Sequence, residues 1–101
     1  MNVESRSPNV FMKQIHIFIH GDVQGVGYRS WMKQKAQELH LTGWVKNRED
    51  SAVEAIIQGN DEHVMQMVSL CKKGPDVAWV EKVEIIEGLP DLHLVSFEVL
   101  Y

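Results

Sequence analysis

The feature that most constrains the fold is the order in which differently patterned segments follow one another. Isoleucines alternate with other residues over 14–20, which is the period of a strand with one buried face. Over residues 28–39 the apolar residues instead recur at spacings of three and four, so this segment predicts an amphipathic helix. A strand therefore leads through a short, glycine-containing loop into a helix.

Next, the chain predicts a hairpin and a second helix. Two β-prone runs, 42–48 and 52–59, meet at a short polar junction that is typical of a tight turn. Asn60 is a good N-cap for a helix over 61–73, and Gly74 with the proline after it ends that helix.

The end of the chain completes the pattern. Strands are predicted over 77–86, with a bulge near residue 81, and over 96–101. The order β-α-β-β-α-β, plus a short C-terminal strand, is the pattern of a ferredoxin-like α+β sandwich, with two helices on one face of a mainly antiparallel sheet. The right-handed crossover through the first helix makes the strands on either side of it parallel, so their carboxyl ends share one edge of the sheet.

The chain length predicts one domain, since 101 residues are too few for two hydrophobic cores. Residues 1–11 are polar and contain a Ser-Pro-Asn turn cluster, so we predict a loose N-terminal extension there and a folded domain over 12–101.

Charge and apolar content exclude several classes of partner. The net charge is −4 and no basic run exceeds Lys72-Lys73, so nucleic acid is not an expected partner. No apolar run approaches the ~20 residues of a membrane span. The single cysteine, Cys71, lies on the apolar stripe of the second helix, where a core thiol is expected, and it fits a reducing compartment. We therefore expect a cytoplasmic protein.

The loop between the first strand and the first helix contains three glycines and is followed by an arginine. In GDVQGVGYR (21–29) Arg29 falls in the first helical turn, where the helix dipole and free N–H groups disfavour a cation. A bound anion resolves this conflict, because glycines let the amides turn toward a common point and a guanidinium pairs with two oxygens of a phosphate-sized dianion. The alternative is a glycine-rich turn with an ordinary surface arginine, and the pattern alone leaves both open.

Asn47 is expected near Arg29, because it lies near the end of the strand that follows the first helix. Taken alone, an asparagine beside a hairpin is most often a turn residue.

The histidines give no metal site, since His16 and His20 are ~13 Å apart along a strand and the other three are scattered. No cofactor is predicted.

Two segments resemble the signatures of the acylphosphatase family. VQGVGYR (23–29) resembles the first, and GWVKN (43–47), followed by Val53-Glu54 and Gly59, resembles the second. The likeness covers residues 13–101. It implies a ferredoxin-like enzyme that hydrolyses the carboxyl–phosphate bond of acyl phosphates without a metal.

The resemblance also implies roles for individual residues. Asn47 would hold the attacking water and, with Arg29, form the catalytic pair. Inorganic phosphate or sulfate would compete with the acyl phosphate, and we expect a monomer. The phosphate-binding residues would be Gln24, Gly25, Val26, Gly27, Tyr28 and Arg29.

Four residues depart from the family pattern. His40 and Ser51 stand where the family usually has glycine, so both are strained if the backbone there is left-handed. Tyr28 replaces the commoner phenylalanine. Asp22 adds a negative charge that would weaken phosphate binding if it pointed inward.

Two other functions fit parts of the pattern. One is a module that binds an anion or carbamoyl phosphate within a larger maturation enzyme, although a chain ending at Tyr101 favours the single-domain form. The other is a single-stranded RNA binder with Phe18 and Trp44 on an open sheet face, which the acidic balance disfavours.

Overall fold

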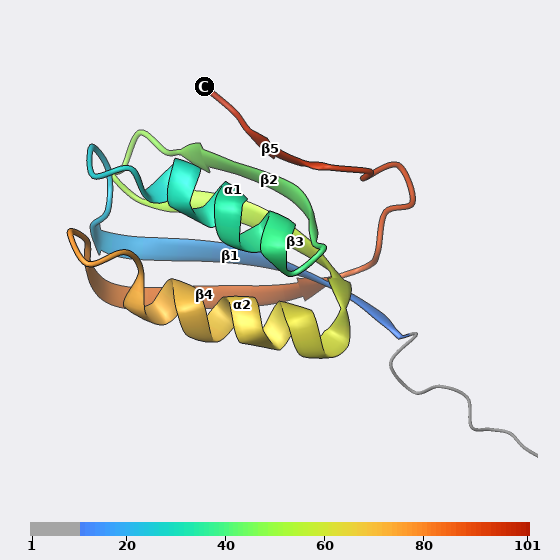
Figure 1. Ribbon diagram of the computed structural model, residues 1–101. Helices are drawn as coiled ribbons and strands as arrows, with labels where there is room; N and C mark the ends of the chain where they lie inside the picture. The colour runs from blue at the N-terminus through green and yellow to red at the C-terminus, as the bar shows by residue number, and fades with distance from the viewer. Residues whose placement is uncertain (1–10) are drawn as a thin grey trace, which may run out of the picture.

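The computed structural model describes residues 11–101, which form a five-stranded sheet and two helices (Figure 1). The predicted extension over 1–11 lies, apart from Phe11, outside the described residues. In chain order the elements are β1 (Met12–Asp22), α1 (Tyr28–Glu38), β2 (Thr42–Asn47), β3 (Val53–Asn60), α2 (Asp61–Lys73), β4 (Trp79–Gly88) and β5 (Phe97–Val99).

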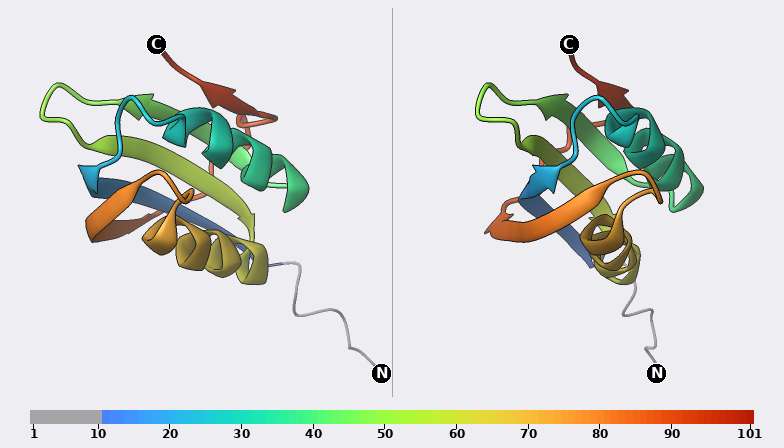
Figure 2. Two further views of the ribbon diagram at one scale, coloured as in Figure 1. Left: turned by 60° about the vertical axis from the view of Figure 1, so that its left-hand side comes forward. Right: turned by 90° about the vertical axis from the view of Figure 1, so that its left-hand side faces the viewer.

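The strands lie in the order β4-β1-β3-β2-β5. β1 is antiparallel to β3 and β4, and β2 is antiparallel to β3 but parallel to β5. β1 and β2 therefore run in the same direction with β3 between them, and their carboxyl ends share one edge as expected. Both helices cover the same face of this mainly antiparallel sheet (Figure 2), which confirms the predicted ferredoxin-like α+β sandwich.

The core lies between the helices and the covered face of the sheet. The three alternating isoleucines of β1 are at most 1% exposed, and burying each contributes on the order of 2 kcal/mol. The predicted stripe of α2 is also buried. The residues that β1, α1 and α2 contribute to the core are Ile15, Ile17, Ile19, Tyr28, Met32, Ala36, Val64, Met67, Val68 and Cys71.

β4 carries the predicted bulge beside the end of β1. Opposite β1, the pairing steps from Lys82 to Val80, so Glu81 is the extra residue. Gly21 fits here because its φ is 134° and a Cβ would lie 2.2 Å from the carbonyl oxygen of Trp79. Gly21 therefore allows the two backbones to approach closely just before the loop that follows β1.

α2 has the ends that its sequence predicts. The Asn60 side chain accepts hydrogen bonds from the backbone N–H groups of Glu62 (2.9 Å) and His63 (3.4 Å), which makes it the N-cap. Gly74, with φ of 70°, ends the helix.

The backbone is left-handed at both positions where glycine was expected. His40 has φ of 57° after the end of α1, where the N–H of Leu41 donates to the carbonyl of Ala36 at 2.8 Å. Ser51 has φ of 77° in the β2–β3 turn. The predicted strain is therefore present, at ~1 kcal/mol for each residue.

Candidate functional site

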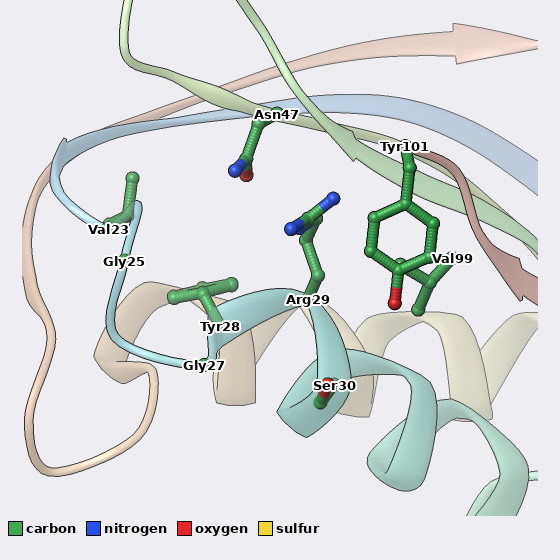
Figure 3. Close-up of a pocket in the computed structure, with 9 residues that line it drawn as sticks. All are labelled: Val23, Gly25, Gly27, Tyr28, Arg29, Ser30, Asn47, Val99 and Tyr101. Atoms are coloured by element: carbon green, nitrogen blue, oxygen red, sulfur yellow. The ribbon is translucent and has the colours of Figure 1, made fainter.

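A pocket of about 90 Å³ lies where the carboxyl ends of β1 and β2 meet the N-terminus of α1 (Figure 3). The structure thus brings Arg29 and Asn47, eighteen residues apart, into one cavity. The residues that line it are Val23, Gly25, Gly27, Tyr28, Arg29, Ser30, Asn47, Val99 and Tyr101.

The loop between β1 and α1 lines the pocket, and it provides no side-chain cap for the first turn of α1. Gly25 and Gly27 have φ of 76° and 80°, in the region that favours glycine. Gly27 is the N-cap, makes no side-chain capping bond, and is followed by no acidic residue in the first turn. Because α2 has both an asparagine cap and two acidic residues there, the first turn of α1 is the one suited to an external anion.

Arg29 is held from the far end of the chain. Its Nη1 donates to the carbonyl oxygen of Leu100 at 3.0 Å. Its guanidinium carbon lies 4.7 Å from the centroid of the Tyr101 ring, within the range of a cation–π interaction. A guanidinium has five N–H donors, so donors remain for a ligand once this orientation is set.

Asn47, the last residue of β2, points its side-chain amide into the pocket toward Arg29 and the loop (Figure 3). Among residues 11–101 this amide has no hydrogen-bond partner, although the residue is half-buried. It therefore offers two donors and an acceptor to whatever occupies the pocket.

Two of the predicted phosphate-binding residues direct their side chains elsewhere. Gln24 bonds to the β2–β3 turn, and Val26 packs against the core. Neither lines the pocket. Phosphate binding by the backbone amides of these two residues remains a prediction, as does phosphate binding by the loop as a whole. Asp22 is exposed and also does not line the pocket.

The Tyr28 side chain points from the loop into the core. Its hydroxyl donates to the carbonyl of Cys71 at 2.6 Å. Burial, together with the neighbouring Cys71, raises the pKa of the Tyr28 phenol far above its ordinary value. Burial likewise raises the pKa of the Cys71 thiol to about 12. Cys71 is thus a protonated core thiol, as the sequence predicts.

The pocket has no side chain able to exchange a proton near neutral pH. Its lining contains no Asp, Glu, His, Cys or Lys. Over the described residues, no group of three or more His, Cys, Asp or Glu is arranged to hold a metal ion. No helix in residues 11–101 has the length and apolarity to cross a membrane.

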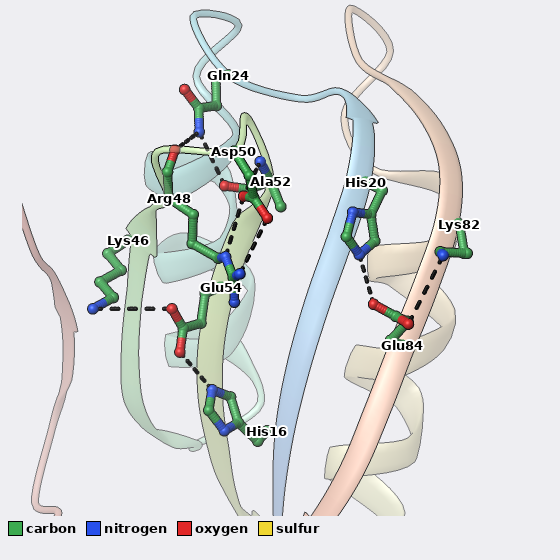
Figure 4. Close-up of polar contacts among 10 residues, drawn as sticks. All are labelled: His16, His20, Gln24, Lys46, Arg48, Asp50, Ala52, Glu54, Lys82 and Glu84. Atoms are coloured by element: carbon green, nitrogen blue, oxygen red, sulfur yellow. Dashed lines mark hydrogen bonds and ion pairs between the residues drawn. The ribbon is translucent and has the colours of Figure 1, made fainter.

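The open face of the sheet carries Phe18 and Trp44, as the RNA-binding alternative requires, but protein cations already cover these rings. Arg48 lies 5.1 Å from the Phe18 centroid and Lys46 5.5 Å from that of Trp44. Carboxylates lie among them, with Glu54 2.6 Å from His16 (Figure 4). A single-strand binder needs free aromatic rings in a basic groove, so this face does not favour the alternative.

Sequence reasoning missed part of the pocket wall. Val23 and Ser30 directly flank the predicted phosphate-binding residues 24–29, so the sequence pattern could have indicated them. Val99 and Tyr101 come from β5 and the residues after it, and no sequence signal indicated that this strand lies beside β2.

Comparisons with known proteins agree with this geometry. The acylphosphatase family model matches residues 15–99. An acylphosphatase of Thiobacillus denitrificans is 47% identical over 76 residues, which cover 75% of this chain and 85% of that protein.

Solved structures agree as well. The crystal structure of an acylphosphatase from Bacillus subtilis superposes with a TM-score of 0.84 at 31% identity, covering 90% of this chain and all of that one. An acylphosphatase from Coxiella burnetii gives 0.81 at 36% identity, covering 88% and 93%. The family model over residues 15–99 and the similarity to these relatives in sequence and fold show that this protein belongs to the acylphosphatase family.

Proposed function

We propose that this acylphosphatase hydrolyses its substrate with a phosphate-binding loop, an arginine and an asparagine, and without a metal ion. The phosphoryl oxygens would be bound by backbone amides of residues 24–29 and by Arg29, and Asn47 would hold the attacking water. The observation that carries this proposal is the convergence of an uncapped helix N-terminus, the Arg29 guanidinium and the unpaired Asn47 amide on one pocket.

The leaving group explains why such a site is sufficient. Water attacks phosphorus, and the phosphorus–oxygen bond to the acyl group breaks with its electrons remaining on the carboxylate. The conjugate acid of that carboxylate has a pKa of about 4, so no proton donor is needed at neutral pH. The proton released by the water passes to the phosphate product or to solvent. The lack of Asp, Glu, His, Cys and Lys in the pocket lining is consistent with this requirement.

The chemical task that remains is electrostatic and positional. Preorganised donors neutralise the phosphoryl oxygens, and a fixed water lies in line with the leaving group. Arg29 suits the first task because its guanidinium lies at the pocket, bonded to the Leu100 carbonyl and next to the Tyr101 ring, with donors left for the phosphoryl oxygens. Asn47 suits the second because its amide both accepts and donates hydrogen bonds.

The test separates the two residues by role. Arg29 contacts charge that is present in both the bound substrate and the transition state, so Arg29→Ala should raise KM and lower kcat together. Arg29→Lys should recover little, because an ammonium cannot make the two-pronged contact. Asn47→Ala should lower kcat by roughly 100-fold with almost unchanged affinity for inorganic phosphate.

Benzoyl phosphate turnover and inhibition by inorganic phosphate measure both effects, and circular dichroism confirms that each variant is folded. If Asn47→Ala lost phosphate affinity as severely as Arg29→Ala, or kept nearly full turnover, the water-holding role would be wrong.

A further inference from the structure

Gln24 lies in the proposed phosphate-binding loop, but its side chain reaches the β2–β3 turn (Figure 4). Its Nε2 donates to the carbonyl oxygen of Arg48 at 2.8 Å and to that of Ala52 at 3.0 Å. A carboxamide nitrogen has two N–H groups, so both are used by these backbone carbonyls.

The same two carbonyls also close the turn itself. The Ala52 carbonyl accepts from the backbone N–H of Arg48 at 2.8 Å, and the Arg48 carbonyl accepts from the N–H of Ser51 at 3.3 Å. The Arg48 and Ala52 carbonyls thus each accept two hydrogen bonds, one from the turn and one from the Gln24 side chain.

These bonds join the two halves of the site. On one side are the loop and the first turn of α1, and on the other is Asn47, which directly precedes Arg48 in the chain. Within the described part of the chain, no other hydrogen bond connects residues 23–27 with residues 47–52. Beyond the pairing of β1 and β2 with β3, the direct hydrogen bonding between the two halves therefore comes from one side chain.

We propose that Gln24 is a positioning residue that sets the place of the Asn47 amide relative to the phosphate-binding loop. This inference rests on the proposed function, because it assumes that Asn47 acts on the water. Glutamine suits the position since one neutral nitrogen satisfies two carbonyls, whereas an ionised carboxylate of the same shape cannot donate to either. A misplacement of ~1 Å at a reacting group costs roughly 100-fold in rate.

The decisive variant is Gln24→Met, which keeps the side-chain length and removes both donors. We expect kcat to fall by roughly 10- to 100-fold, because the turn that follows Asn47 loses its hydrogen bonds to the loop and the Asn47 amide can shift relative to it. The inhibition constant of inorganic phosphate should change less than about threefold, because the loop amides and Arg29 remain. The matched control is Gln34→Met, which alters an exposed glutamine of α1 whose contact, to Glu38 at 3.4 Å, is remote from the pocket. It should leave both constants as they are.

A double-mutant cycle tests whether Gln24 acts through Asn47. In the Asn47→Ala background, Gln24→Met should lower kcat by less than about threefold, because the amide that Gln24 positions is already absent. Adding Gln24→Met to Arg29→Ala should lower kcat by nearly its full single-variant factor.

Several results would overturn the proposal while leaving the proposed function intact. These are full turnover by Gln24→Met, an equal loss of phosphate affinity and turnover, or an undiminished effect of Gln24→Met in the Asn47→Ala background. Full turnover by Asn47→Ala would refute both ideas. If thermal unfolding shows that Gln24→Met does not fold, the same cycle is run with Gln24→Asn, which is one methylene too short to reach both carbonyls and should show a reduced kcat with the same coupling to Asn47.

Discussion

Removing the Tyr28 hydroxyl should destabilise the domain. This hydroxyl donates to the Cys71 carbonyl at 2.6 Å, and Tyr28 is 1% exposed. The carbonyl lies in the last turn of α2, and Pro75 stands at the position whose N–H would otherwise continue the helical bonding. Tyr28→Phe therefore leaves a buried acceptor without a donor.

The cost follows from these contacts. A hydrogen bond of this kind contributes about 1 kcal/mol, and an unsatisfied buried carbonyl adds a comparable penalty, so the free energy of unfolding should fall by about 2 kcal/mol. For a domain of this size, that loss lowers Tm by roughly 10 °C. Thermal and urea unfolding measure it, with Tyr101→Phe as the control, because Tyr101 is 99% exposed and should melt like the wild type. A Tyr28→Phe variant as stable as the wild type would refute the argument.

Three further predictions follow from the backbone and from the proposed site. Ser51→Gly and His40→Gly should each raise the free energy of unfolding by about 0.5–1 kcal/mol, because the backbone is left-handed at both residues. The gain is measured as a higher urea midpoint with an unchanged slope of free energy against urea concentration. Unchanged midpoints would mean that the strain is relieved elsewhere. Turnover of benzoyl or acetyl phosphate should be insensitive to a chelator, and phosphate monoesters should be poor substrates because an alkoxide needs a general acid; equal turnover of the two classes would contradict the mechanism. Sulfate at 100 times its Kd should stabilise the protein by ~2.7 kcal/mol, measured as a Tm shift. This shift should be absent in Arg29→Ala.

The parts of the fold that the sequence predicted are those in which periodicity directly reports burial. The isoleucines of β1 and the stripe of α2 fall where expected, and α1 ends one residue earlier than predicted, at Glu38. The bulge at Glu81 was also predictable, because apolar residues there break strict alternation.

Strand ends were less predictable because partners determine them. β1 extends from Met12, opposite Asn60, to Asp22, opposite Trp79, beyond the alternating run. β4 starts two residues later than predicted, after a turn in which the Ala78 N–H donates to the Pro75 carbonyl at 2.9 Å. Such boundaries depend on tertiary pairing, which a single sequence pattern does not contain.

The candidate site divides in the same way. Topology alone predicted that Arg29 and Asn47 would meet, because a right-handed crossover brings the ends of parallel strands together. The contact of Arg29 with the Leu100 carbonyl was unpredictable, since every residue carries a carbonyl and only the position of β5 selects this one. The hydrogen bonds of Gln24 escaped prediction for the same reason, as both acceptors are backbone atoms.

Because Leu100 and Tyr101 contact Arg29, the geometry of this site depends on the local stability of one edge strand. The two bonded residues, Arg29 and Leu100, are 71 positions apart, so the guanidinium is oriented only after β5 has docked. β5 pairs with β2 over three residues, at the edge of the sheet. Short edge segments open with smaller free energies than whole domains do. The fraction of molecules with an oriented Arg29 is therefore governed by the docking equilibrium of the last strand, and it can change under conditions that leave the rest of the sheet folded.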